Sequence, residues 1–153
     1  MTHALNMTIP LKQDPESQKK LQELKRDFAT KYQPKMDKAL RDSEIVHFAR
    51  VVVIGDKFLQ VITEYEGDHK GYTEFFRKAL PEVFDAIFSL AEGAPGFGQL
   101  DEQSFFKISK SLQHRSLGES TDGEEDGQGN TEGYLFSAYG DRSVKEILKQ
   151  LKK

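Results

Sequence analysis

The chain has 153 residues, enough for one domain with a hydrophobic core, and a formal net charge of -3 at pH 7. It has no cysteine, which excludes a disulfide framework, a thiolate nucleophile and a cysteine-type zinc site; the charge gives no reason to expect a nucleic-acid partner. No apolar segment is long enough to span a bilayer, and the first residues lack a secretory pattern, so we expect one cytoplasmic domain over residues 1–153 without a membrane partner.

A strand and an interrupted helix are predicted before residue 45. Residues 6–12 ("NMTIPLK") have the pattern of a short strand, and Pro10 indicates an edge, a bulge or a strand end because it has no N–H to donate. Asp14 is the expected N-cap of a helix in which apolar residues recur at helical spacing. Pro34 should kink or interrupt that helix, which continues for another turn or two.

Residues 45–68, "IVHFARVVVIGDKFLQVITEYEGD", predict two apolar strands around a Gly55-Asp56 turn. If Ile54 pairs with Lys57, His47 lies opposite Glu64 on one face of the hairpin and Arg50 lies on the other face. Both faces are largely apolar, so each needs a cover: the helices for one, and later segments or a second subunit for the other. A long apolar edge strand invites pairing, and we therefore expect a homodimer formed through the sheet.

The second half of the chain predicts three helical stretches. The first follows Asp68, its expected N-cap, and ends near Gly93, with a kink or break at Pro81. The second is a short amphipathic helix capped by Asp101, and the third follows Ser143, with its apolar residues expected to face inward.

Two segments separate the last two helices. Residues 118–133, "GESTDGEEDGQGNTEG", have no apolar side chain and predict a flexible acidic loop within the domain. A calcium loop is the alternative, but the EF-hand spacing of acidic residues is absent, and we expect no metal site. Residues 134–139 ("YLFSAY") predict a strand. The resulting order is βαββαβ, an α+β fold of the ferredoxin-like type with an antiparallel sheet, extra helices and a C-terminal helix.

The charged residues of the hairpin each allow two interpretations. A carboxylate beside the His47 imidazole favours the protonated ring and tunes a proton shuttle, but the same pair also satisfies a cross-strand hydrogen bond. A buried Arg50 needs a partner, which a helix carboxylate such as Glu23 or Asp27 would supply; an anionic ligand is the functional alternative.

The stretches "IVHFARVVVI" and "TEYEGDHKGY" resemble uncharacterised bacterial proteins of the dimeric α+β-barrel group, in which an "IHFAR"-type strand precedes an aromatic-acid-Gly turn and a Tyr-containing helix. The resemblance covers the central third of the chain and implies a ferredoxin-like dimer. Relatives by fold include dye-decolorizing haem peroxidases, chlorite-dismutase-like proteins and small cofactor-free monooxygenases. The "YEGDH" segment departs from the Gly-x-x-Asp-Gly pattern of those peroxidases.

Two main functions follow from these observations. The first is a module that binds a small ligand or a partner at the sheet face around His47, Gln60 and Glu64, since phosphate-loop, nucleophile-elbow and HExxH signatures are absent. The alternative implied by the resemblance is an oxidoreductase, either haem-dependent or cofactor-free. There His47 would be ligand or proton shuttle, Glu64 would orient it, and Arg50 or Tyr65 would support the site.

Two other histidines are weaker candidates for a haem ligand, and these are His69 and His114. A third function, an adaptor that uses the acidic loop, has the least support, because loops of this composition are usually solvated linkers.

Overall fold

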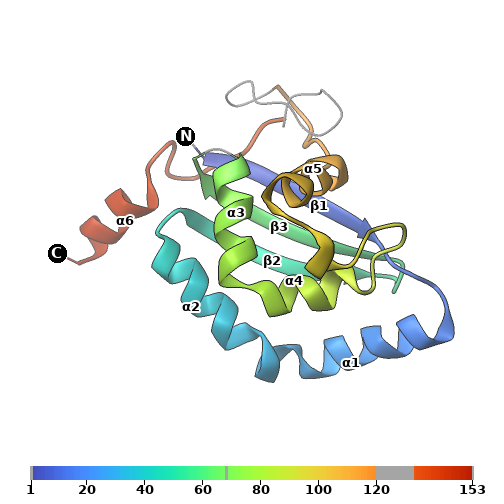
Figure 1. The fold of residues 1–153 in the computed structure, drawn as a ribbon. Helices are drawn as coiled ribbons and strands as arrows, with labels where there is room; N and C mark the ends of the chain where they lie inside the picture. Colours follow the sequence, from blue (N-terminus) through green and yellow to red (C-terminus); the bar gives the residue numbers. More distant parts are fainter. Residues whose placement is uncertain (1, 68, 120–132, 153) are drawn as a thin grey trace.

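The computed structural model describes residues 2–67, 69–119 and 133–152, which form an α+β structure (Figure 1). The strands are β1 (Thr2–Pro10), β2 (Val46–Ile54) and β3 (Phe58–Glu66). The helices are α1 (Pro15–Lys31), α2 (Gln33–Ser43), α3 (His69–Ala79), α4 (Pro81–Phe88), α5 (Glu102–Leu112) and α6 (Val144–Leu151), with a 3-10 turn at Phe97–Gln99.

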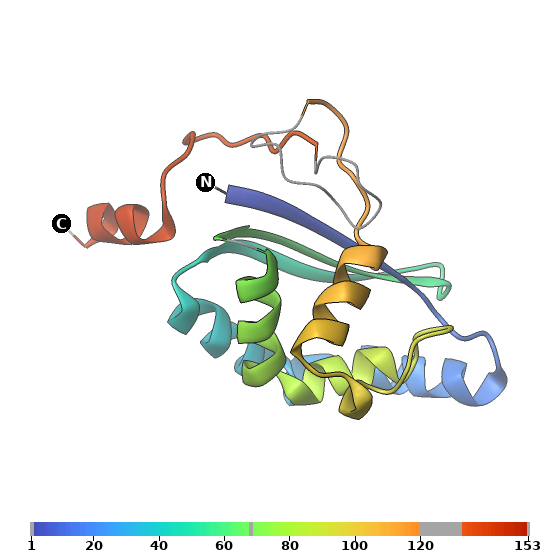
Figure 2. The ribbon, with the colours of Figure 1, turned by 45° about the horizontal axis from the view of Figure 1, so that its top comes forward.

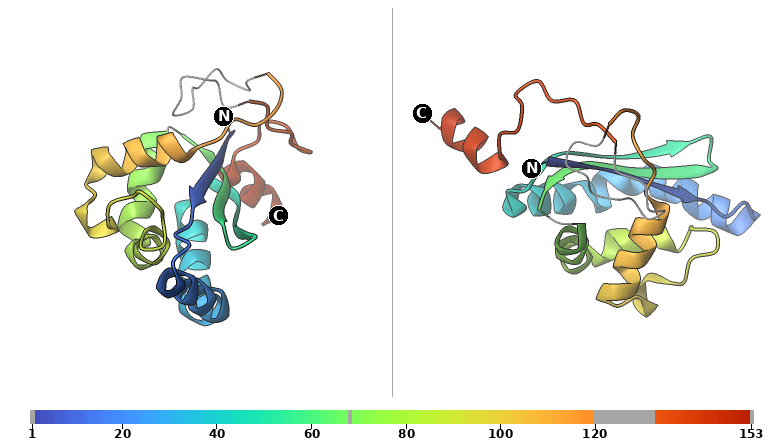
Figure 3. Two further views of the ribbon diagram at one scale, coloured as in Figure 1. Left: turned by 90° about the vertical axis from the view of Figure 1, so that its right-hand side faces the viewer. Right: turned by 90° about the horizontal axis from the view of Figure 1, so that it is seen from above.

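The sheet is antiparallel with strand order β1-β3-β2, so β2 is an edge strand, as expected. Helices α1 to α5 all lie on one side of it (Figures 2 and 3). Residues 133–143, which we call the strap, cross the other side near one end, and α6 projects beyond that end. We call this second side the open face of the sheet.

Successive side chains of a strand point to opposite faces of the sheet, which explains which residues are buried on the helix-covered side. Every second residue of β1 and β3 is buried there, including Leu5, Met7, Ile9, Leu59 and Val61. Beneath them, four phenylalanine rings pack with centroids 5.2 to 6.5 Å apart; these are Phe84, Phe88, Phe97 and Phe105. This cluster is a large part of the hydrophobic core that fixes α4 and α5 to the sheet.

Several helix boundaries are where the sequence predicts them. Asp14 accepts a hydrogen bond from the Ser17 backbone N–H at 3.0 Å, and the first helix breaks at Tyr32, just before Pro34. The helix around Pro81 also divides, into α3 and α4. The expected N-cap Asp68 lies outside the described residues.

The hairpin differs from the predicted register by one residue. Gly55 and Asp56 form the expected turn with φ of 56° and 54°, and the Lys57 N–H donates to the Ile54 carbonyl. However, Ile54 pairs with Phe58 rather than Lys57, and Lys57 belongs to the turn, where its carbonyl accepts from the Leu11 N–H.

The predicted strand at residues 134–139 is wrong. These residues belong to the strap and form no strand. The outer edge of β1, beside which a further strand would pair, is already occupied: Gln113 bridges to Met7, and the His114 N–H donates to the Asn6 carbonyl at 2.9 Å. The described residues therefore supply three of the four expected strands.

The C-terminal helix begins after Ser143, as predicted, with a capping box between Ser143 and Glu146. Its expected inward orientation is wrong in part, because no residue of α6 is fully buried and Leu151 is 75% exposed. Residues 120–132, most of the predicted acidic loop, lie outside the described residues.

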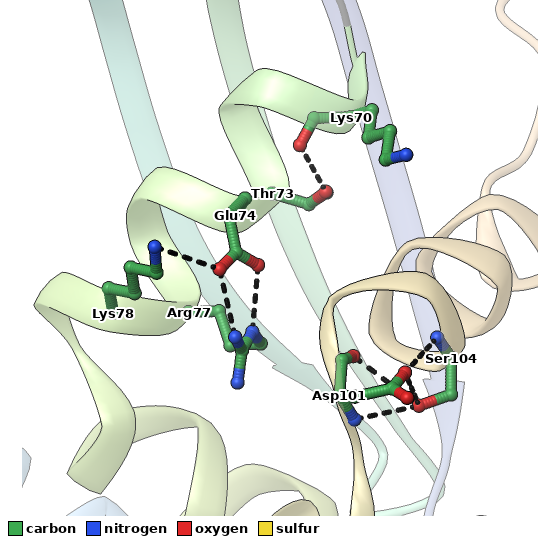
Figure 4. Close-up of polar contacts among 7 residues, drawn as sticks. All are labelled: Lys70, Thr73, Glu74, Arg77, Lys78, Asp101 and Ser104. Carbon is green, nitrogen blue, oxygen red and sulfur yellow. Dashed lines mark hydrogen bonds and ion pairs between the residues drawn. The ribbon is translucent and has the colours of Figure 1, made fainter.

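Charged side chains on α3 and at the start of α5 stabilise the helical layer (Figure 4). Glu74 accepts two hydrogen bonds of 2.8 Å from Arg77 and forms an ion pair with Lys78. Asp101 and Ser104 form a reciprocal capping box at the start of α5. All of these partners are satisfied locally, which identifies the group as helix stabilisation rather than a site.

Candidate functional site

A β-bulge at His47 determines where the candidate site lies. Val46 pairs with Tyr65 and Phe48 pairs with Glu64, so His47 is the extra residue between them. The bulge turns its ring to the open face, where Nε2 lies 2.9 Å from Oε2 of Glu66 and the side chain is only 3% exposed. The prediction that His47 lies opposite Glu64 is therefore wrong. The pairing is shifted by one residue from the turn up to Phe48, which lies opposite Glu64, and the bulge at His47 ends that shift.

Both ring nitrogens of His47 have partners. Nε2 contacts Glu66 and also lies 3.2 Å from the Thr2 hydroxyl, and Nδ1 lies 2.7 Å from the Tyr139 hydroxyl. Because an ionised carboxylate only accepts hydrogen bonds, a neutral ring donates from Nε2–H to Glu66. Nδ1 then accepts from the Tyr139 O–H.

The same carboxylate also holds the chain beyond Tyr139. The Val144 N–H, at the start of α6, donates to Oε2 of Glu66 at 2.7 Å. Tyr139, His47, Glu66 and Val144 thus form one hydrogen-bonded chain, which we call the latch, between the sheet and the C-terminal end of the strap.

The strap is also fixed at its beginning. The Tyr134 N–H donates to the Leu117 carbonyl at 3.3 Å. Gly133 has φ of 87°, and a Cβ at this position would come within 2.1 Å of the Ser116 carbonyl oxygen, so only glycine fits this crossing. The described strap is therefore attached to the body at both ends.

Between the strap and the open face lies a pocket of ≈ 500 Å³. Its sheet side includes Phe48, Arg50 and Glu64, and its strap side includes Leu135, Phe136 and Ser137. A second hollow, of ≈ 660 Å³, lies between α2 and α6, but its Asp37 and Arg41 already pair with each other at 2.6 Å. The pocket beneath the strap holds Arg50 and Glu64, which form no such ion pair with any described residue, and we therefore take it as the candidate site.

Glu64 is the most distinctive group in this pocket. It is half-buried on the open face, and no donor from the described residues hydrogen-bonds to it or forms an ion pair with it. Burial raises the pKa of the Glu64 carboxyl, and the neighbouring Arg50 and His47 side chains offset part of that rise. The carboxylate thus offers an acceptor to a molecule entering the pocket.

Arg50 lies beside the pocket but does not have the partner expected for it. It is exposed on the open face, opposite Ile62 of β3, whereas α1 lies on the other side of the sheet. Asp27, one of its proposed partners, pairs with Arg26 at 2.9 Å. The expected pairing with Glu23 or Asp27 is wrong because strand alternation directs Arg50 away from the helices.

Tyr65, the fourth candidate, is a core residue. It is 1% exposed on the helix-covered side, stacked on Tyr72 with ring centroids 4.2 Å apart. Burial raises the pKa of Tyr72, whose hydroxyl donates to Thr63 at 2.9 Å. The structure therefore separates Tyr65 from the pocket, although the oxidoreductase alternative implied by the resemblance gives it a supporting role in the site.

The remaining candidates are Gln60, His114 and His69, and the lining described for the pocket includes neither Gln60 nor His114. Gln60 is on the open face, but its amide donates to the Thr8 hydroxyl at 3.1 Å. His114 is exposed at the edge of β1, and the described structure does not include the side chain of His69. Of the predicted residues, the structure brings together His47, Glu64 and Arg50.

Sequence reasoning missed Tyr139 and the role of Glu66. Burial raises the pKa of the Tyr139 hydroxyl, and the Glu64 and Glu66 carboxylates raise it further. In the sequence, Glu66 stands out only as the acidic residue of the aromatic-acid-Gly turn on which the resemblance depends. The available signal was the acid-Gly sequence at the end of β3, which places a carboxylate where the strand leaves the sheet.

Comparisons with protein-family models, curated proteins and solved structures give no match for this chain. Across residues 2–67, 69–119 and 133–152, no helix has the length and apolar character needed to cross a membrane. Within the same ranges, no three His, Asp or Glu side chains are grouped so that they would hold a metal ion. The function is therefore argued from the pocket and the latch.

Proposed function

We propose that the protein binds a small, largely apolar molecule in the pocket between the open face of the sheet and the strap. The main support for this proposal is the half-buried Glu64 carboxylate, which has no donor among the described residues and lies among apolar walls in a space of ≈ 500 Å³. Small-molecule sites typically combine a mostly apolar hollow of this size with a few polar groups that orient the ligand. The latch contributes by holding one wall of the pocket in place.

A neutral aromatic probe tests this proposal. Titration of 2-phenylethanol should shift the backbone amide NMR signals of Phe48, Ser137 and Ala138, which line the pocket, and leave that of His114 unchanged. Ala138→Phe fills the pocket and should abolish the shifts, because its ring takes the probe's volume. Ala29→Phe, on the exposed side of α1, is the matched control and should keep them. Shifts that survive Ala138→Phe would place binding elsewhere.

The second candidate function is an oxidoreductase of the cofactor-free kind. The observation that favours it is the latch itself, in which Tyr139, His47 and Glu66 form a hydrogen-bonded chain beside the pocket. Such a chain can accept a proton from a bound substrate at the Tyr139 hydroxyl and place it on His47, next to a carboxylate that stabilises the charged ring.

A haem-dependent version does not fit the geometry of His47. Both ring nitrogens are hydrogen-bonded, so neither has a free lone pair for iron unless Tyr139 or Glu66 moves away. We expect haemin added to the protein and to His47→Ala to give the same visible absorption spectrum. A Soret band that shifts in the parent and not in the variant would contradict this expectation and favour the peroxidase-like alternative.

We also propose that two chains pair through their open faces, as in a dimeric α+β barrel built from ferredoxin-like units. The edge position of β2 and the order β1-β3-β2 are compatible with such a unit. Ile54 and Phe58, at the turn end of the hairpin, remain exposed on the open face at the end away from His47. A second copy would remove these apolar side chains from water.

Sedimentation of matched variants tests the dimer. Phe58→Lys should convert a dimer to a monomer, because it places a charge in the proposed interface. Phe75→Lys is the control, since Phe75 has nearly the same exposure (40% against 41% for Phe58) but lies on α3, on the covered side of the sheet. A parent protein that sediments as a monomer at all concentrations would rule the dimer out.

A further inference from the structure

The charge and the hydrogen-bonding groups of the pocket beneath the strap favour one class of ligand over others. Resting on the ligand-binding function proposed above, we infer that it prefers organic cations, in which an apolar body carries a protonated amine directed at Glu64. The inference depends on which polar groups of the pocket are already occupied, on the sign of the charge there, and on the side chains around it.

Most polar groups near the pocket already have a hydrogen-bond partner in the protein. His47 uses both ring nitrogens, and the Tyr139 hydroxyl donates to one of them in the neutral ring. Glu66 accepts from His47 and from the Val144 N–H through the same oxygen. Glu64 is different, because no described residue donates to its carboxylate. An ammonium group supplies the missing donor together with the opposite charge, which makes the strongest class of hydrogen bond.

The surroundings of the Tyr139 hydroxyl, at the edge of the pocket, are electronegative. The Glu64 and Glu66 carboxylates both act on the Tyr139 hydroxyl, where they disfavour a further negative charge. A ligand carboxylate placed there would add a third anion beside these two. A ligand ammonium would instead relieve the cost of the half-buried Glu64 carboxylate, to which no residue in the described part of the chain donates.

Arg50 is the one positive side chain that lines this pocket among the described residues, and it does not cancel Glu64. It forms no ion pair with that carboxylate and is exposed, so water and salt screen its charge more than the charge of half-buried Glu64. A ligand that binds by a carboxylate would have to use Arg50 and stay near the solvent. Binding through a ligand ammonium should therefore depend on Glu64, whereas binding through a ligand carboxylate should depend on Arg50.

The aromatic walls suit the same ligand class. Phe48 and Phe136 line the pocket with large exposed rings, and the Tyr139 ring is stacked near His47 at a centroid distance of 5.7 Å. Aromatic rings attract cations over their faces and pack against an apolar body. An amine with an aromatic or aliphatic group of a few carbons matches both features.

Three probes of similar shape separate the alternatives: 2-phenylethylamine, 2-phenylethanol and 3-phenylpropanoate. In backbone amide NMR titrations at pH 7, the amine should have a dissociation constant about tenfold lower than that of the alcohol, and the carboxylate should bind most weakly. Glu64→Gln, which keeps the side-chain shape, should remove the advantage of the amine. Arg50→Gln should keep that advantage or increase it, and it serves as the matched control.

The outcomes also separate this inference from the function on which it rests. If the alcohol binds as tightly as the amine, or if the carboxylate binds best and depends on Arg50, the preference for cations is wrong while the pocket remains a binding site. If none of the three probes shifts the amides of Phe48, Ser137 and Ala138, both the inference and the proposed function are overturned.

Discussion

Replacing His47 with alanine should release the C-terminal end of the strap and lower the free energy of unfolding by about 2 kcal/mol. The ring is nearly completely buried and bonds to Glu66 on one side and to Tyr139 on the other. Its removal leaves a partly buried carboxylate and a hydroxyl without their shared partner, and unpaired polar groups of this kind are costly. Urea denaturation monitored by circular dichroism gives the change in free energy.

Two further variants show whether the loss of stability comes from the hydrogen bonds of the latch. Tyr139→Phe removes only the hydroxyl of the latch and should cost about 1 kcal/mol, the usual net value of one hydrogen bond. His114→Ala, on the exposed edge of β1, is the matched control and should change stability by less than about 0.5 kcal/mol. Equal stability of His47→Ala and His114→Ala would mean that the latch contributes nothing to the fold.

The largest loss of stability is expected for Phe105→Ala, at about 3–5 kcal/mol. Phe105 is buried on α5, and its ring lies 5.2 to 5.8 Å from the rings of Phe84, Phe88 and Phe97. Truncation removes apolar contacts and leaves a cavity that three large, constrained rings cannot fill completely.

Thermal and urea unfolding of Phe105→Ala should be compared with Phe75→Ala. Phe75 is substantially exposed on α3, so its truncation should cost less than about 1 kcal/mol. Similar losses for the two variants would show that the ring cluster does not form the core described above. The Phe105 variant should leave the latch geometry intact, because α4 and α5, which carry most of its cluster, lie on the side of the sheet opposite to the strap (Figure 2).

The helix boundaries could be predicted because their causes are local. Asp14, Asp101 and Ser143 each cap a helix through the backbone N–H three residues ahead, and this spacing is visible in the sequence. Pro34 and Pro81 interrupt helices for an equally local reason, since proline lacks the N–H that a helix interior needs.

The register of the hairpin was not predictable in the same way. Both faces of β2 are largely apolar, so a shift of one residue leaves the hydrophobic pattern almost unchanged. The register departs from the predicted one at two positions: Lys57 belongs to the turn, and His47 forms a bulge. The second irregularity brings His47 to Glu66 rather than Glu64, and no local signal specifies it.

The strap could not be predicted, because its position depends on residues that are far from it in the sequence and already occupy the edge of β1. The residues "YLFSAY" have strand-forming side chains, but the edge of β1 is taken by Gln113 and His114. Tyr139 then bonds to His47, 92 residues earlier in the chain. Tyr65, which was a candidate from the sequence, is instead a core residue, because strand alternation directs it to the helix-covered side of the sheet.

The central claim is that the latch holds the strap over the pocket, and the backbone N–H of Val144 tests it most directly. This N–H donates to Glu66 at 2.7 Å, so its hydrogen exchange reports on the latch itself. Exchange should be slow in the parent protein, fast in His47→Ala and Glu66→Ala, and slow again in His114→Ala. An amide that exchanges freely in the parent, or stays protected without His47 and Glu66, would contradict the account.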